Sequence, residues 1–293
     1  MQASRTAVLV CQGRAAADGR LAVGEFADPV AARLLRPEEL VPVAQVRREQ
    51  RPAETRDRIR YEWVRGCAEI VVPRTVAIDR AVTEAGAPQV VVVGAGLDSR
   101  AWRLPALRSS TVYLVDHPAS LADAQARSAG LDPVAGRLVR VAADLGRADL
   151  TGALADAGHD AQVPTTWVWE GVVPYLTRDQ VRTTVAAIGR SSAPGSTLVV
   201  NYQAPSLAST LGRPLGWLIV RLARAEHPMR GEPWRSAWTP ARMAELLRTH
   251  GFVPREDEAL LRIAQRLGSP TTGRHSLASG RVVSAVRGDG AVS

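Results

Sequence analysis

Two glycines and three acidic residues are the parts of this sequence best placed to do chemistry. Gly94 and Gly96 follow a run of four valines, and glycine lets a chain turn sharply and approach a ligand without interference from a Cβ atom. Asp116, Asp144 and Glu170 each fall at the end of a short apolar segment predicted to be a strand. Because parallel strands end at the same edge of a sheet, we expect these carboxylates to converge beside the glycine turn.

The spacing of these acids indicates which ligand they could bind. Asp116 lies 20 residues after Gly96, where a carboxylate can accept both hydroxyls of an adenosine ribose, each bond contributing on the order of 1.5–3 kcal/mol. Asp144 can accept from an adenine amino group, and Glu170 can meet a cationic amino group. The dinucleotide fingerprint needs a third glycine where this chain has Ser99. The set therefore favours S-adenosylmethionine over a nicotinamide dinucleotide.

The elements that must position these residues alternate along the middle of the chain. Strands are predicted at residues 90–93, 111–115, 137–142, 166–173, 196–203 and 281–287, and helices at 99–107, 178–190 and 240–249. Strands that alternate with helices are typical of a doubly wound α/β fold with a mostly parallel sheet. The valines of residues 90–93 suit a central strand covered by helices on both faces.

The N-terminal quarter has weaker patterns. Residues 1–20 are predicted to form a mobile arm or a short helix, and residues 37–52, with three prolines, a connector or lid. A helix is predicted over 54–72, ending at Pro73, with a second one over 74–85. We expect a single domain, divided into a helical cap (1–72), a cofactor-binding core (73–203), a lid insertion (204–237) and a C-terminal part of the core (238–293).

Composition narrows the classes of partner and compartment. The net charge is +8 and lysine is absent, but the arginines are scattered, so a nucleic-acid partner is not expected. Two cysteines make no disulfide framework, no apolar run is long enough to cross a membrane, and no metal-ligand spacing occurs. We expect a cytoplasmic chain without a metal site or a membrane partner.

The residues also resemble a known family. VVVGAGLDSRAWRL, YLVDHP, VAADL and WVWEGVVPYL are similar to segments of the leucine carboxyl methyltransferase family, as are FADPVAARLL, PRTVAID and GEPWRSAWTP nearer the two ends. The resemblance covers most of the chain. It implies a class I methyltransferase with a seven-stranded Rossmann-like sheet, S-adenosyl-L-methionine as cofactor and S-adenosyl-L-homocysteine as product. The bacterial branch implies an O-methyltransferase of secondary metabolism, such as antibiotic biosynthesis.

The resemblance also implies roles for individual positions. The implied cofactor-binding residues are Arg74 on the methionine carboxylate, Gly94, Ala95 and Gly96 along the methionine moiety, Asp116 on the ribose, Asp144 and Leu145 near the adenine, and Glu170 near the methionine part. His117 adjoins Asp116 in the sequence and is therefore also expected near the adenine. The family has a further basic residue near the N-terminus. Arg14 and Arg20 both remain open for that role.

The acceptor side is less defined. A carboxylate acceptor is already ionised at neutral pH and needs no general base, whereas a hydroxyl would benefit from one. The candidates for catalysis are His227 and Tyr175. The candidates for substrate binding are Tyr175, Tyr202, Arg230, Trp234 and Arg235, because arginines can pair with a substrate carboxylate and aromatic rings can form the wall of an apolar pocket.

The function expected from the sequence is therefore methyl transfer to a carboxylate or hydroxyl of a small-molecule acceptor, by a monomer or homodimer. Two alternatives stay open. The same fold could catalyse a cyclisation or rearrangement without methyl transfer, or the chain could methylate a protein carboxylate. An isotope-labelled methyl group on the cofactor distinguishes the three functions. The label would appear in a metabolite for the expected function, in a protein for the protein methyltransferase, and in neither for the cyclisation or rearrangement.

Overall fold

A single seven-stranded sheet organises the computed structural model, which describes residues 4–144, 150–205 and 234–289. The strands are β1 (Gln89–Val93), β2 (Thr111–Asp116), β3 (Arg137–Ala142), β4 (Thr165–Trp169), β5 (Thr197–Gln203), β6 (Phe252–Ala259) and β7 (Gly280–Arg287). Their order is β3-β2-β1-β4-β5-β7-β6, and β7 pairs antiparallel with both of its neighbours. The predicted doubly wound, mostly parallel α/β fold is confirmed.

Strand β1 lies where the sequence pattern requires it. Val90, Val91, Val92 and Val93 are at most 2% exposed, because β2 and β4 flank the strand and helices cover both faces. The order of the strands reverses on the two sides of β1, with β2 and β3 on one side and β4 and β5 on the other. Ligands of open α/β sheets bind at such a switch point, beyond the carboxyl ends of the strands.

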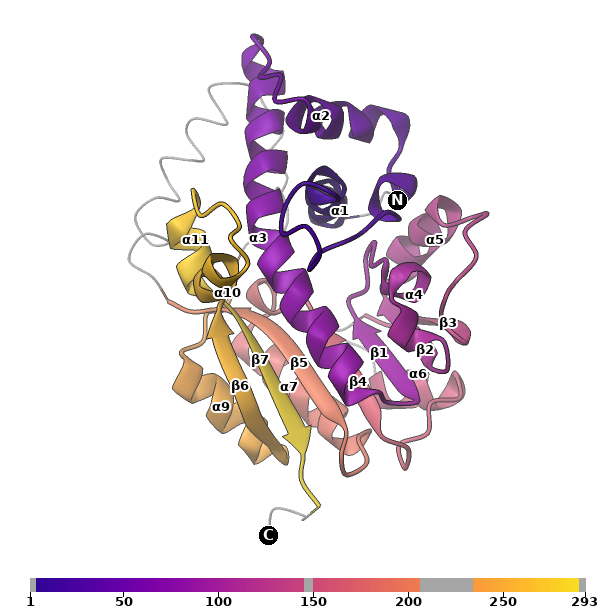
Figure 1. Cartoon of the computed structure of the whole chain (residues 1–293). Helices are drawn as coiled ribbons and strands as arrows, with labels where there is room; N and C mark the ends of the chain where they lie inside the picture. The colour runs from indigo at the N-terminus through magenta and orange to yellow at the C-terminus, as the bar shows by residue number, and fades with distance from the viewer. Residues whose placement is uncertain (1–3, 145–149, 206–233, 290–293) are drawn as a thin grey trace.

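Helices form a layer on each face of the sheet (Figure 1). The helices are α1 (Arg5–Ala17), α2 (Pro37–Arg47), α3 (Thr55–Ala85), α4 (Arg100–Arg103), α5 (Pro118–Arg127), α6 (Leu150–Asp156), α7 (Arg178–Arg190), α9 (Pro240–Thr249), α10 (Leu260–Arg266) and α11 (Arg274–Ser279). Short 3-10 turns are η1 (Ala31–Leu34), η2 (Pro105–Leu107) and η3 (Val173–Tyr175). Figure 1 shows α3 running along the sheet, with α1 and α2 packed beside its N-terminal half.

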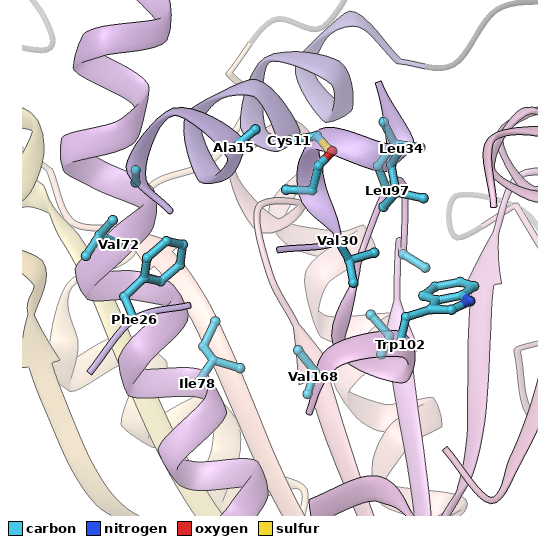
Figure 2. Close-up of a cluster of buried hydrophobic side chains, with 14 of the residues drawn as sticks. Cys11, Ala15, Phe26, Val30, Leu34, Val72, Ile78, Leu97, Trp102 and Val168 are labelled. Atoms are coloured by element: carbon cyan, nitrogen blue, oxygen red, sulfur yellow. The ribbon is translucent and has the colours of Figure 1, made fainter. Parts of the chain in front are cut away.

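Two buried clusters hold the layers together. The first lies between the sheet and the helices α1 and α3, and Figure 2 shows Cys11, Phe26 and Ile78 among its side chains. The second lies on the opposite face and contains Trp167 and Trp169 of β4 together with residues of α6, α7 and α9. The first cluster fixes the N-terminal helices to the sheet, so α1 is part of the core and not the mobile arm allowed by the sequence.

Two predictions in the N-terminal quarter are wrong because both treated prolines as incompatible with a helix. Helix α3 is 31 residues long and continues through Pro73. Val71, Val72 and Arg74 around the proline are all buried, so packing maintains the helix although proline lacks the N–H. The sequence predicts a connector or lid over residues 37–52, but α2 occupies most of that range. Pro37 stands in its first turn, where proline is well tolerated.

Three further expectations changed in the remainder of the chain. Strand β4 ends at Trp169, so Glu170 follows the strand instead of lying within it. The helix predicted over 99–107 is only the short α4 followed by η2, because Pro105 interrupts it. Strand β6 was not predicted, since its sequence FVPREDEA is charged and contains a proline, as an edge strand tolerates.

The predicted lid falls mostly on residues 206–233, which lie outside the described residues, so the division into cap, core and lid stays a prediction. Among the helices that the structure describes, none is long and apolar enough to cross a membrane.

Candidate functional site

A pocket opens at the carboxyl ends of β1, β2 and β4, and helix α1 covers one side of it. The residues that line it are Ser4, Thr6, Ala7, Val10, Arg14, Arg74, Val92, Gly94, Ala95, Gly96, Leu97, Asp98, Asp116, Ser120, Glu170, Gly171, Val172 and Tyr175. The glycine turn and two of the three predicted acids, Asp116 and Glu170, therefore meet at one place, whereas the third, Asp144, does not line the pocket.

The glycine turn needs glycine at both positions. Gly94 and Gly96 have φ angles of +70° and +50°, a region that residues with a Cβ rarely adopt. A Cβ on Gly94 would clash with Cγ2 of Val172. The backbone N–H of Gly94 donates to the carbonyl of Val115 at 2.8 Å, which ties the turn to β2.

Gly94→Ala is expected to destabilise the fold by about 1–3 kcal/mol, because the left-handed backbone becomes strained and Val172 must move. Gly86→Ala is the matched control. Gly86 ends α3 with φ +54°, and a Cβ there would come no closer than 4.0 Å to the carbonyl oxygen of Thr83. Urea unfolding should show a smaller loss for Gly86→Ala than for Gly94→Ala, and equal losses would contradict the contact with Val172.

Asp116 forms one end of the pocket. Its two carboxylate oxygens accept hydrogen bonds from the N–H groups of Gly96 at 2.6 Å and His117 at 2.7 Å. Burial raises the pKa of Asp116, although these two N–H groups oppose the shift. Each oxygen has a second lone pair, so the carboxylate is oriented and can still accept from a ligand.

Glu170 and two arginines form the other end. One oxygen of Glu170 accepts from Nε of Arg74 and the other from a terminal nitrogen of Arg100, both at 2.7 Å. Burial alone would raise the pKa of Glu170, but Arg74 and Arg100, with Arg14 beyond them, hold it well below its usual range. Glu170 is therefore an ionised carboxylate held from behind, on the same wall as the Arg74 guanidinium.

Of the two N-terminal arginines left open by the sequence, Arg14 lines the pocket. Its Nε pairs with Asp28 at 2.8 Å, and a terminal nitrogen donates to the carbonyl of Leu97 at 2.6 Å. Arg20 lies elsewhere, paired with Glu49 on the exposed surface. Helix α1 thus brings a third charged side chain to the same end of the pocket as Arg74 and Glu170.

The residues predicted near an adenine lie around the other end. His117 directly follows Asp116, is exposed, and accepts the N–H of Ala119 at the start of α5. Asp144 follows β3, the neighbour of β2, and is exposed without lining the pocket. Leu145 lies outside the described residues.

The predicted acceptor-side residues separate into three groups. Tyr175 lines the pocket. Trp234 and Arg235 lie beside the turn η3 that carries Tyr175, since the N–H of Arg235 donates to the carbonyl of Pro174 at 2.6 Å. Arg230 and His227 lie outside the described residues.

The structure contradicts the prediction for Tyr202. Its ring is fully buried within the cluster that contains Trp167 and Trp169, and it does not line the pocket. Its hydroxyl donates to Asp257 at 2.6 Å and accepts from Arg281 at 3.1 Å, linking β5 to β6 and β7. Burial raises the pKa of Tyr202, and the bond to Asp257 adds to the shift. Tyr202 is a structural residue.

Tyr202→Phe should therefore lower the free energy of unfolding by about 1–2 kcal/mol, because Asp257 loses a partly buried hydrogen bond while its pairing with Arg281 remains. Chemical denaturation measures this loss. Affinity for a ligand of the pocket should not change, and a large change in affinity would contradict the structural role of Tyr202.

Sequence reasoning missed a set of charged residues behind the pocket. They are Asp28, Asp79, Arg100 and Arg103, joined by buried ion pairs to Arg14 and Glu170. All four fall within the segments FADPVAARLL, PRTVAID and GLDSRAWRL that carry the family resemblance. Those segments gave the signal, but charge spacing alone did not show that the residues meet.

Comparisons with known proteins indicate the family of this chain. The family model described as "Leucine carboxyl methyltransferase" matches residues 7–189. A relative from Mycolicibacterium paratuberculosis is 37% identical over 155 residues, which cover 51% of this chain and 48% of the relative. One from Streptomyces coelicolor is 41% identical over 131 residues, 43% of this chain and 46% of the relative. Both carry the name "Putative S-adenosyl-L-methionine-dependent methyltransferase".

The chain spans about half the length of these curated relatives. A crystal structure of a protein of the DUF574 family from Streptomyces avermitilis is similar over 97% of this chain and 98% of its own, with a TM-score of 0.57 and 15% identity. At that identity the likeness concerns the fold alone. The family match covers more than half of the chain, which therefore belongs to the leucine carboxyl methyltransferase family of S-adenosyl-L-methionine-dependent enzymes.

Proposed function

We propose that this chain transfers a methyl group from S-adenosyl-L-methionine to a carboxylate or hydroxyl oxygen of a small-molecule acceptor, with S-adenosyl-L-homocysteine as the product. One observation carries the proposal. The pocket has a carboxylate, Asp116, at one end and a paired cation and anion, Arg74 and Glu170, at the other, with the glycine bend of Gly94 and Gly96 between them.

This set of charges fits the two polar ends of the cofactor. The amino-acid end carries one positive and one negative charge, and Glu170 and Arg74 offer the opposite charges side by side. A guanidinium has five N–H donors, and the ion pair of Arg74 with Glu170 uses one of them. Arg74 and Arg14 would hold the carboxylate and Glu170 the ammonium group. Ala95, within the bend, would lie along the same part.

The nucleoside end has its own partners. Asp116 would accept from the ribose hydroxyls, because backbone N–H groups already hold its carboxylate in place. Strand β3 lies next to β2, so Asp144 and Leu145 would approach the adenine from the adjacent strand end. His117 would lie near them.

The bound cofactor supplies a methyl group on a sulfonium, already activated for displacement. The chain has to align the acceptor oxygen and exclude water, and such positioning can contribute roughly 7–11 kcal/mol. Helix α1 covers the pocket, and Tyr175 lines it near Val172. On the acceptor side we propose Tyr175, Trp234, Arg235 and Arg230. Tyr175 or His227 would be the base if the acceptor is a hydroxyl.

The wider assignment rests on the same proposal. The chain would act as a cytoplasmic monomer or homodimer in secondary metabolism, such as antibiotic biosynthesis, without a nucleic-acid or membrane partner. Residues 1–72 would form the cap over the core of residues 73–203, and residues 204–237 the lid.

The test is a transfer assay with methyl-labelled cofactor and a panel of small acids and phenols. We expect the label in a small-molecule product, and the bond can be assigned because mild alkali releases methanol from a methyl ester but not from a methyl ether. Label recovered in protein would overturn the small-molecule acceptor. A substrate converted without any label would overturn methyl transfer.

A further inference from the structure

We propose that Arg100 and Asp79, which do not line the pocket, are positioning residues that fix its amino-acid end for the cofactor. The proposal rests on the proposed function and adds a layer of residues that acts only through Glu170, Arg74 and Arg14. Its physical basis is a buried ion-pair network whose members have defined partners.

Arg100 lies directly behind Glu170. Its side chain is 3% exposed and pairs with Glu170 at 2.7 Å and Asp79 at 2.6 Å, while a third nitrogen pairs with Asp98. Three carboxylates around one planar group require the guanidinium fork, which a lysine cannot reproduce because its charge is a single point. Glu170 is therefore held between a pocket arginine, Arg74, and an arginine from α4.

Asp79 connects this arrangement to helix α1. One of its oxygens pairs with Arg100 at 2.6 Å and the other with Arg103 at 2.7 Å. Arg103 then reaches Asp28 at 3.4 Å, and Asp28 pairs with Arg14 at 2.8 Å. The two pocket arginines, from α1 and α3, thus belong to one network.

The network is balanced in charge. Its members are the cations Arg14, Arg74, Arg100 and Arg103 and the anions Asp28, Asp79, Asp98 and Glu170. Removing the negative charge of Asp79 leaves the buried guanidiniums of Arg100 and Arg103 each short of one partner. They will then compete for the remaining carboxylates, including that of Glu170. Glu170 and Arg74 then no longer keep the spacing that the ligand's charges require.

The network reaches only one end of the pocket, and this makes the proposal testable. Asp116 accepts hydrogen bonds from the backbone N–H groups of Gly96 and His117 and from the side chain of Ser120, none of which belongs to the network. S-adenosylhomocysteine and 5′-methylthioadenosine share the nucleoside, but the second lacks the amino-acid groups. A defect of the network should weaken the first ligand and spare the second.

The experiment measures both affinities by calorimetry for wild type, Asp79→Asn and Arg100→Lys. We expect each variant to lose about tenfold or more in affinity for S-adenosylhomocysteine and less than about twofold for 5′-methylthioadenosine, since charge-assisted bonds at the amino-acid end are the ones disturbed. The ratio of the two affinities is the readout, because a general loss of stability would weaken both ligands together.

Arg127→Lys is the matched control. Arg127 is another buried arginine with three carboxylate bonds, to Asp123 at 2.6 Å and to Glu39 at 2.6 and 2.9 Å, but it joins α5 to α2 away from the pocket. We expect a lower melting temperature for this variant with an unchanged affinity ratio.

Wild-type affinity ratios in Asp79→Asn and Arg100→Lys would overturn the positioning role and leave the proposed function standing. If Arg100→Lys does not fold, Asp79→Asn decides alone, because asparagine keeps the size of the side chain. A wild-type chain that binds neither ligand would overturn the proposed function, and the positioning role with it.

Discussion

Asp116→Ala is expected to reduce the affinity for S-adenosylhomocysteine by about 100-fold or more, because two charge-assisted hydrogen bonds to the ribose are worth on the order of 1.5–3 kcal/mol each. The same variant should lose affinity for 5′-methylthioadenosine by a similar factor, since both ligands contain the ribose. Isothermal calorimetry on the purified chain measures both. The loss at both ligands distinguishes the ribose end from the network behind Glu170.

Asp160→Ala is the control for this experiment. Asp160 is an exposed loop aspartate whose carboxylate, like that of Asp116, accepts a backbone N–H, here from Gln162 at 2.8 Å, but it lies near the start of β1, at the opposite edge of the sheet. Its loss should leave both affinities unchanged. An Asp116→Ala variant that binds like wild type would show that the ribose lies elsewhere.

Glu170→Gln is expected to lower the free energy of unfolding by about 3–5 kcal/mol at neutral pH, because Arg74 and Arg100 lose the charge that compensates them in a buried site. The side chains of Glu170 and Arg100 are 11% and 3% exposed. Urea unfolding at constant salt measures the loss.

Glu258→Gln is the control for Glu170→Gln. Glu258 accepts two bonds from Arg266 at 2.8 and 2.9 Å, but the Arg266 side chain is about half exposed, so the loss should be at most about 1 kcal/mol. Equal losses for Glu170→Gln and Glu258→Gln would contradict the buried network.

The effect of Glu170 should also depend on pH in a defined direction. The arginines hold the pKa of Glu170 below its ordinary value of 4.5, so its contribution is complete above that pH and declines as the pH falls, because the unfolded chain takes up the proton first. The difference between wild type and Glu170→Gln should shrink by about 1.4 kcal/mol between neutral pH and about pH 3.5. A difference that grows on acidification would contradict the direction of the shift.

Sequence patterns predicted the central part of this fold well and its margins less well. Strand β3 and helices α7 and α9 begin and end where the pattern placed them, because apolar periodicity and caps such as Thr177 and Thr239 act locally. The helix end predicted at Pro73 and the failure to predict β6 are errors of the opposite kind, because local sequence signals did not decide the structure there. A buried helix continued through proline, and a charged segment became an edge strand, and both depend on neighbours distant in sequence.

The residues of the candidate site also divide into those that local sequence predicts and those that only tertiary packing brings together. Asp116 and Glu170 could be found because each lies at the carboxyl end of an apolar strand, so their convergence is a consequence of the parallel sheet. Arg14, Asp28 and Asp79 could not be placed, since α1, the loop after it and α3 meet the pocket only through tertiary packing. Tyr202 was misassigned because nothing in its local sequence shows which face of β5 it occupies.

The most direct test of the account is a crystal structure of the chain with S-adenosylhomocysteine. We predict that the ribose hydroxyls lie against Asp116 and the amino-acid group against Arg74 and Glu170, with the ligand crossing the bend at Gly94 and Gly96. A ligand bound elsewhere, or lying in the pocket with the ribose away from Asp116, would contradict the central claim.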